Sequence, residues 1–272
     1  MIKIENMSFA YSRRKPNIHT NLTLEIKPNK VYGLLGKNGT GKSTLLYLIA
    51  GLLRPTSGTV TMNGTPTIKR NVENMREIFL VNEEFLLPEI PMNDWAKTYG
   101  KFYPNYNNDL FRSCLHEFEI AGNPNLGTLS MGQKKKVFIA FAVATGVKFL
   151  IMDEPTNGLD IPSKAQFRKV IARYIMEDSS VIISTHQVHD VDLLIDHVII
   201  IDKDTLLLNE SIADITDKYV FEYRTPGAPA DDVIYQEPAL QGNATMAYRR
   251  EGMAETNVNL ELLFNAIISK KQ

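Results

Sequence analysis

The sequence predicts an α/β fold: a core built on a parallel sheet, an antiparallel β subdomain at the N-terminus, a helical insert and a small αβ appendage at the C-terminus. Two observations predict the parallel core. Short apolar runs, FLIMD at 149–153 and SVIIST at 180–185, alternate with helical patterns, as strands buried on both faces do. A glycine-rich loop, GKNGTGKST at 36–44, follows an apolar run and precedes a helical one.

Residues 1–64 have the pattern of strands and tight turns around one helix. LTLEI at 22–26 alternates apolar and polar residues, and VYGLLG at 31–36 is an apolar run that ends in glycine. KSTLLYLIAGLL at 42–53 predicts a helix that begins at the glycine-rich loop. RPTSGTVTMNG at 54–64 then predicts a turn, a short strand and a second turn.

Helical spacing over residues 93–120 predicts a mostly helical insert at about 85–128. Asn93 is a candidate cap for its first helix, and Asn108 or Asp109 for its second, because short polar side chains can accept from free N–H groups at a helix start.

A composition shift near residue 217 divides the chain into a main domain at 1–216 and a small appendage at 217–272. YRTPGAPADD at 223–232 is rich in Pro, Gly and Asp, which indicates a loop or boundary. Short alternating runs follow, and NLELLFNAIIS at 259–269 predicts a last amphipathic helix. We expect the appendage to be separable from the main domain.

Charge, cysteine content and hydropathy limit the possible environments. The net charge of −1 and the pI of about 6.5 give no basic field for nucleic acid. The single cysteine, Cys114, excludes a disulfide within the chain and fits a reducing compartment. The apolar runs are far shorter than the ~20 residues of a membrane helix, and the N-terminus lacks a signal-peptide pattern. We therefore expect a cytoplasmic protein that does not itself span a membrane.

The loop at 36–44 fits the phosphate-binding pattern G-x-x-x-x-G-K-[ST]. Its glycines allow backbone N–H groups to turn toward phosphates, and the helix N-terminus adds partial positive charge. Lys42 would neutralise the β- and γ-phosphates of a nucleotide, and the Ser43 hydroxyl would take one place on Mg²⁺. The predicted nucleotide-binding residues of the loop are Gly36, Lys37, Asn38, Gly39, Thr40, Gly41, Lys42, Ser43 and Thr44.

FLIMDEP at 149–155 supplies two acids at the end of an apolar strand. Asp153 is placed to hold Mg²⁺ through water. Glu154 follows directly, where a carboxylate could act as the general base for an attacking water. Strands that end in two acids are common, and it is the phosphate loop earlier in the chain that favours this interpretation.

Five motifs in order carry a family resemblance: the phosphate loop, LSMGQ at 129–133, FLIMDEP, NGLD at 157–160 and STH at 184–186. Over about residues 1–215 they resemble the nucleotide-binding subunit of an ATP-binding-cassette (ABC) transporter. The resemblance implies a P-loop NTPase core that binds ATP with Mg²⁺ and hydrolyses ATP. It also implies a head-to-tail dimer with two ATP molecules between the subunits.

In such a dimer, the LSMGQ segment of one subunit contacts the nucleotide held by the phosphate loop of the other. The resemblance thus makes Ser130, Gly132 and Gln133 contacts to the partner's γ-phosphate. Ser130 also suits the N-cap of the helix that starts near Met131, which would direct that helix N-terminus at the anion.

Three further residues take roles through the resemblance. Tyr11 resembles the aromatic residue that stacks on adenine, although a packing role at a strand end stays open. His186 would contact the γ-phosphate and link the attacking water, Glu154 and the partner subunit. Asp160 would lie at the dimer seam.

The sequence departs from the family pattern at two places. Met131 stands where the family often has Gly, and we expect altered packing with retained binding. Asn82 or Glu83 stands where the family has Gln, and the alignment favours Glu83. A carboxylate there could bind Mg²⁺ or water but would repel phosphate if unpaired, and a purely connecting loop is the alternative.

The lysine run that follows LSMGQ is ambiguous. Lys136 matches a position that is often basic in the family. Lys134 and Lys135 are expected on a solvated helix face.

The expected function is ATP hydrolysis that powers a separate transmembrane transporter subunit, with this chain peripheral on the cytoplasmic face of the cell membrane. The chain would work as a homodimer or as a heterodimer with a second ATPase subunit, and its short length and tail favour export. Docking would occur near the helical insert and the loop at 82–88. FLLPEIPM at 85–92 is apolar there, which fits docking and plain packing equally.

Three other interpretations are less compatible with the sequence. DNA-repair clamps need a long coiled coil between the phosphate loop and the signature, and the 90 positions from Lys42 to Gly132 leave no room for one. Ribosome-acting relatives usually join two cassettes in one chain, whereas one is present here. A nucleotide sensor without turnover is disfavoured because Glu154 and His186 are both present.

Overall fold

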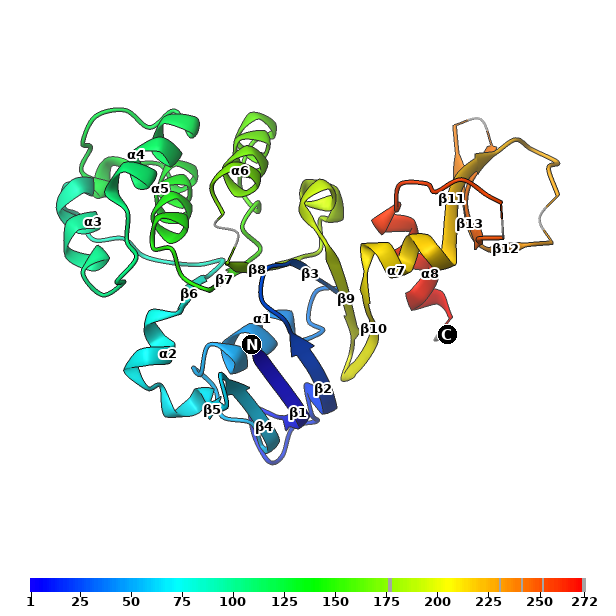
Figure 1. The fold of residues 1–272 in the computed structure, drawn as a ribbon, viewed down its shortest axis with the longest axis horizontal. Helices are drawn as coiled ribbons and strands as arrows, with labels where there is room; N and C mark the ends of the chain where they lie inside the picture. The colour runs from blue at the N-terminus through cyan, green and yellow to red at the C-terminus, as the bar shows by residue number, and fades with distance from the viewer. Residues whose placement is uncertain (176–177, 230, 241, 251, 271–272) are drawn as a thin grey trace.

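The computed structural model describes residues 1–175, 178–229, 231–240, 242–250 and 252–270. A six-stranded sheet of order β10-β9-β3-β8-β7-β6 lies at its centre (Figure 1). The strands are β3 (Val31–Leu35), β6 (Ile78–Val81), β7 (Phe149–Asp153), β8 (Ser180–Thr185), β9 (His197–Asp202) and β10 (Thr205–Ser211). β10 runs antiparallel to β9, and the other neighbouring strands are parallel. The predicted parallel core is confirmed.

The N-terminal part forms a second, antiparallel sheet of order β2-β1-β4-β5. Its strands are β1 (Ile2–Phe9), β2 (His19–Ile26), β4 (Ser57–Met62) and β5 (Thr65–Pro66). Helix α1 (Lys42–Ile49) shares one buried cluster with both sheets. α1 is shorter than the helix predicted at 42–53, because Gly51 takes a positive φ of 69° directly after the C-cap residue Ala50.

The helical insert is confirmed between β6 and the signature segment. Helix α2 (Val72–Arg76) precedes β6, and α3 (Met92–Gly100), α4 (Asn108–Glu117) and the 3₁₀ turn η2 (Leu126–Thr128) form the insert. The two predicted caps are wrong by one or two positions. Pro91 occupies the N-cap of α3 in place of Asn93, and Asn107 caps α4 with its side-chain oxygen in place of Asn108 or Asp109.

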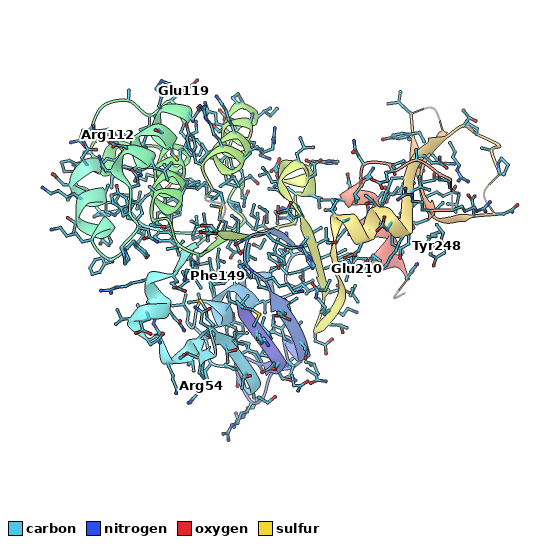
Figure 2. The ribbon with its side chains drawn as sticks, in the orientation of Figure 1. Arg54, Arg112, Glu119, Phe149, Glu210 and Tyr248 are labelled. Atoms are coloured by element: carbon cyan, nitrogen blue, oxygen red, sulfur yellow. The ribbon has the colours of Figure 1, made fainter. Side chains whose placement is uncertain are left out.

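Helices α5 (Met131–Ala144) and α6 (Ile161–Tyr174) join this insert to the central sheet. Phe141 of α5 connects the insert to the sheet. Its ring centroid lies 4.5 Å from that of Trp95 in α3 and 5.8 Å from that of Phe79 in β6. Aromatic pairs at such separations add to the apolar burial. The insert is therefore anchored to β6 through the apolar face of α5. Figure 2 shows Phe149 near the middle of the molecule and Arg112 out on the helical part.

The chain beyond β10 forms a small antiparallel sheet of order β11-β13-β12 between two helices. The elements are α7 (Ile212–Lys218), β11 (Tyr219–Arg224), β12 (Val233–Ala239), β13 (Gly242–Tyr248) and α8 (Leu260–Ser269). The boundary predicted at 223–232 falls between β11 and β12, with Ala230 outside the described residues.

The appendage and the main domain share one buried cluster. Leu260 and Leu263 of α8 belong to the same apolar cluster as Val188 and Val191, which follow β8 near two short 3₁₀ turns, η3 (Val188–Asp190) and η4 (Asp192–Leu194).

A further 3₁₀ turn, η1 (Thr67–Lys69), follows β5. Within the described residues, no helix is long and apolar enough to cross a bilayer.

Candidate active site

A pocket of about 580 Å³ lies at the carboxyl ends of the central strands. The loops after β3, β6, β7 and β8 meet there because parallel strands end at the same edge of a sheet. The lining residues are Tyr11, Ile18, Asn38, Gly39, Gly41, Lys42, Ser43, Thr44, Glu83, Glu154, Asn157 and His186. Most of the predicted phosphate-loop residues and both predicted catalytic residues are thus brought together.

The phosphate loop is held by its own backbone. Lys42 Nζ donates to the Gly36 carbonyl at 2.8 Å, and Thr40 Oγ1 donates to the Lys37 carbonyl at 2.8 Å. Gly41 is the N-cap of α1, with a φ of 94°. A Cβ at Gly41 would lie 2.5 Å from the Ile18 side chain, so both conformation and space require glycine.

The mouth of the pocket carries Tyr11, which is 57% exposed. Its hydroxyl lies 3.0 Å from Thr44 Oγ1, and its ring packs edge-on against Phe9 at a centroid distance of 5.0 Å. More than half of Tyr11 therefore stays accessible. Behind the loop, buried His19 Nε2 lies 3.0 Å from the Gly41 carbonyl, and burial lowers the His19 pKa.

Glu154 is buried at the end of β7 and is contacted from three sides. His186 Nδ1 lies 2.9 Å from Glu154 Oε1, and the His186 backbone N–H donates to Oε2 at 3.4 Å. Lys42 Nζ lies 3.6 Å from the same Oε1 atom. Burying a carboxylate to 6% exposure is costly unless it has such partners.

Ser184 of β8 contacts both acids, and the sequence interpretation missed it. Its hydroxyl donates to Asp153 Oδ1, and its carbonyl accepts from the Glu154 N–H at 3.1 Å. Glu154 has a φ of 45°, which a non-glycine residue adopts only when tertiary contacts hold it. STH at 184–186 contained a signal for the first of these bonds, because a serine hydroxyl can donate to a carboxylate.

The position expected for Lys135 on a solvated helix face is wrong. Lys135 is 7% exposed, and its Nζ donates to the carbonyls of Glu154 at 3.2 Å and Asn157 at 2.8 Å. Helical periodicity contained this signal, since residues at i+4 and i+7, Ile139 and Ala142, are fully buried on the same face. Burial lowers the Lys135 pKa, whereas the nearby carboxylates, Glu83 first, raise it.

Glu83 rather than Asn82 has its side chain in the pocket. Glu83 Oε1 accepts from Asn157 Nδ2 at 2.6 Å. Asn82 Oδ1 is buried, and among the described residues it has no hydrogen-bond partner. Asn157, also missed by the sequence interpretation, is therefore a shared contact of Glu83 and Lys135.

The signature segment forms a capping box at the start of α5. Ser130 Oγ accepts from the Gln133 N–H at 3.2 Å, and Gln133 Oε1 accepts from the Ser130 N–H at 3.0 Å. The predicted N-cap is confirmed. Ser130 and Gln133 are exposed, and a Cβ at Gly132 would meet only the Gly158 carbonyl, at 4.0 Å, among the described atoms.

Asp160 caps α6 and is also exposed. Its Oδ1 accepts from the Ser163 N–H at 2.9 Å, and the hydrogen bonds from Ser163 hold the Asp160 pKa below its usual value. Asp160, Ser130 and Gly132 thus present a polar surface outside the pocket of their own subunit.

A family model described as ABC transporter matches residues 19–157, about half of the chain. The protein belongs to the ABC transporter ATP-binding family. Like the members of that family, it is an ATPase subunit of a transporter.

Relatives and solved structures agree with this membership. The ABC transporter ATP-binding protein NatA of Bacillus subtilis is 30% identical over 74% of this chain and 85% of its own. The bacitracin transport ATP-binding protein BcrA of Bacillus licheniformis is 31% identical over 76% of this chain and 68% of its own. The structure of CbiO1 from Clostridium perfringens, part of an ABC transporter complex, has a TM-score of 0.63 at 25% identity, over 77% of this chain and 88% of that one.

A dimeric bacterial ABC transporter cassette shares the fold with a TM-score of 0.67 at 24% identity, over 78% of this chain and 98% of that one.

The oxygen donors of this ABC ATPase fit Mg²⁺. Mg²⁺ usually keeps waters and phosphate oxygens and takes only one or two protein ligands. The Ser43 hydroxyl lines the pocket, and Asp153 at the end of β7 has one oxygen engaged by Ser184. Within the described residues there is no cluster of three or more His, Cys, Asp or Glu that would form a closed protein cage. Such a sparse set of oxygens suits a metal bound together with a nucleotide.

Proposed function

We propose that this chain binds ATP with Mg²⁺ in the 580 Å³ pocket and hydrolyses ATP within a nucleotide-sandwich dimer that powers export through a separate membrane subunit. One observation carries the proposal: Lys42, Glu154 and His186 converge in a pocket whose floor is the phosphate loop.

The loop 36–44 provides backbone N–H groups for the phosphates, and Lys42 neutralises their charge. The Lys42 ammonium lies between the Gly36 carbonyl and the Glu154 carboxylate, at the base of the pocket that the phosphates would enter. Tyr11, exposed at the pocket mouth, stacks on the adenine. Ser43 and Asp153 would hold Mg²⁺, which would supply positive charge next to the phosphates during hydrolysis.

Glu154 acts as the general base. Its carboxylate accepts a proton from the attacking water, and His186, 2.9 Å away, fixes the carboxylate and contacts the γ-phosphate from the end of β8. Glu83 also lines the pocket, where Asn157 keeps its carboxylate oriented. A carboxylate at this place can order the attacking water.

The second half of each site comes from a partner ATPase subunit, identical or homologous. Ser130, Gly132 and Gln133 are at the surface at the N-terminus of α5, where the helix dipole and free N–H groups attract an anion. A two-fold axis places this surface against the partner's phosphate loop, with Asp160 at the seam. The dimeric cassette of the same fold supports this arrangement.

The membrane subunit docks in an apolar groove of about 510 Å³ between α2, the segment after β6 and α3. Leu86 is 97% exposed, Phe102 65% and Val72 62%. Leu86 on the groove lies three positions after Glu83 in the pocket lining, so an occupant can act on the pocket through this segment. The occupant we propose is a short amphipathic helix from a cytoplasmic loop of the membrane protein, since apolar anchors spaced along one helix face fit such a groove. In the cell the chain is peripheral on the cytoplasmic face of the membrane.

The direction of transport rests on relatives. The SkfA peptide export ATP-binding protein SkfE of Bacillus subtilis, which is 29% identical, supports export. A methionine import ATP-binding protein of 30% identity makes import the alternative outcome. Transport assays in inside-out vesicles with the co-purified membrane protein distinguish the two directions.

The catalytic assignment is tested with Glu154→Gln. We expect ATP hydrolysis to fall about 10²–10⁴-fold while the affinity for ATP is retained, because the amide keeps the shape but cannot accept the proton. Hydrolysis at the wild-type rate would refute the assignment.

For docking, Phe102→Asp should abolish co-purification of the membrane protein. Tyr248→Asp, an exposed aromatic on the appendage, is the matched control that should not.

A further inference from the structure

Asn157 joins three segments that are distant in the sequence. Its carbonyl accepts from Lys135 Nζ of α5 at 2.8 Å. Its side-chain amide donates to Glu83 Oε1, in the segment after β6, at 2.6 Å. Asn157 itself belongs to the turn after β7, whose first residue is Glu154.

Lys135 holds the same turn at its other end. Its Nζ donates to the Glu154 carbonyl at 3.2 Å, while the Glu154 N–H donates to the Ser184 carbonyl at 3.1 Å. The backbone carbonyl and the backbone N–H of Glu154 are thus both held by hydrogen bonds. This matters because Glu154 has a φ of 45°, a conformation that neighbouring contacts must maintain.

The charge of Lys135 needs an explanation that its two carbonyl partners do not supply. A cation that is 7% exposed is costly to bury unless opposite charge lies near it. The carboxylates that favour its charged form are Glu83, Glu154 and Asp153, with Glu83 the largest. Glu83 is also the residue that stands where the sequence resemblance leads one to expect a neutral Gln. The buried cation Lys135 therefore accompanies a carboxylate at a position where the resemblance leads one to expect a neutral residue, and both contact Asn157.

We propose that Lys135 is a positioning residue for Glu154, and that Lys135 and Glu83 form a charge-balanced pair connected through Asn157. This inference rests on the proposed role of Glu154 as general base. It gives α5 a second task. The helix that presents Ser130 toward a partner's nucleotide at its N-terminus also fixes, five residues later, the general base of its own subunit.

The first test compares Lys135→Met with Lys134→Met, the same substitution on the half-exposed neighbour in the same helix. Lys135→Met should lower kcat about 10- to 100-fold with KM for ATP changed less than about threefold, because a base displaced by about 1 Å costs on the order of 10² in rate. Lys134→Met should stay within about twofold of wild type. A Lys135→Met enzyme with more than half the wild-type kcat would overturn the positioning role.

The second test is a double-mutant cycle with milder changes, Glu83→Gln and Lys135→Gln, each checked for folding by circular dichroism. Restoring charge balance in the double variant should raise kcat at least about threefold above Lys135→Gln alone. Strictly additive losses in kcat would overturn the pairing, since a merely structural lysine would respond equally with either residue at 83.

These outcomes are separable from failure of the proposed function. If Glu154→Gln hydrolyses ATP normally, the general-base assignment fails, and the inference fails with it. If Glu154→Gln is inactive while Lys135→Met is fully active, the inference alone is overturned.

Discussion

His186 Nδ1 lies 2.9 Å from Glu154 Oε1, so the ends of two adjacent parallel strands, β8 and β7, are joined by a hydrogen bond between side chains. The backbone N–H of His186 reaches the second oxygen at 3.4 Å, and Lys42 approaches the first from the phosphate loop at 3.6 Å. These contacts hold the Glu154 carboxylate in one orientation. Pre-oriented groups lose little freedom at the moment of reaction, which favours catalysis.

Lys42→Ala should remove most ATP binding while leaving the fold intact. Loss of a charge-assisted contact costs about 1.5–3 kcal/mol, or about ten- to a hundredfold in affinity. Titration with a fluorescent ATP analogue measures the affinity, and circular dichroism checks the fold. Affinity within twofold of wild type would contradict the assignment of Lys42 to the phosphates.

The meeting of the phosphate loop, Glu154 and His186 at one pocket could be predicted from sequence, because each motif is a local pattern with a fixed chemical requirement. A phosphate loop needs glycines and a lysine at set positions. Once that loop is present, an acid at a strand end can be assigned a role beside the nucleotide. The capping box at Ser130 and Gln133 is equally local, since it spans one turn.

The remaining features depend on contacts between distant segments. The solvated position expected for Lys135 was wrong because average hydropathy places lysine at the surface, whereas two carbonyls of a turn 19 and 22 positions away accept from it. The packing of Leu263 against the segment after β8 was likewise invisible, since an amphipathic pattern predicts a buried face but not its partner.

Leu263→Ala should destabilise the whole protein, including the main domain. Leu263 is fully buried in the cluster that contains Val188, close to His186 in sequence. Large-to-small changes in such a core cost about 2–5 kcal/mol. Leu240→Ala, at a fully exposed leucine of the same appendage, is the matched control and should change stability by less than about 0.5 kcal/mol. Urea denaturation measures both. Equal midpoints for the two variants would support an appendage that is separable from the core.

Cys114 should be unreactive in the folded protein. Burial raises the pKa of its thiol to about 12, so at pH 8 almost no thiolate is present. The unfolded chain releases the proton first, so the free energy of unfolding should fall as the pH rises above 9.0, the value for an unburied thiol. A thiol reagent at pH 8 should label the protein rapidly in urea and slowly without it. Fast labelling in native buffer would show that the helical insert opens around α4.

The Glu154→Gln variant should form a stable dimer with ATP and Mg²⁺. ATP that is bound but not consumed bridges the phosphate loop of one subunit and the Ser130–Gly132 surface of the other, and a ligand that binds only the dimer favours it by mass action. Size-exclusion chromatography with light scattering should show a dimer with ATP and mostly monomer without nucleotide.

The decisive comparison adds Ser130→Arg to this variant. Ser130 is exposed and caps α5, so the arginine can be accommodated in the monomer, where losing the cap costs only about 0.5–2 kcal/mol. In the dimer, the same side chain would take the space of the partner's γ-phosphate. The double variant should therefore bind ATP through its own phosphate loop, remain folded and stay monomeric. If the double variant dimerises with ATP as readily as Glu154→Gln alone, the signature segment does not face a partner's nucleotide, and the exposed capping box at Ser130 serves only to begin its helix.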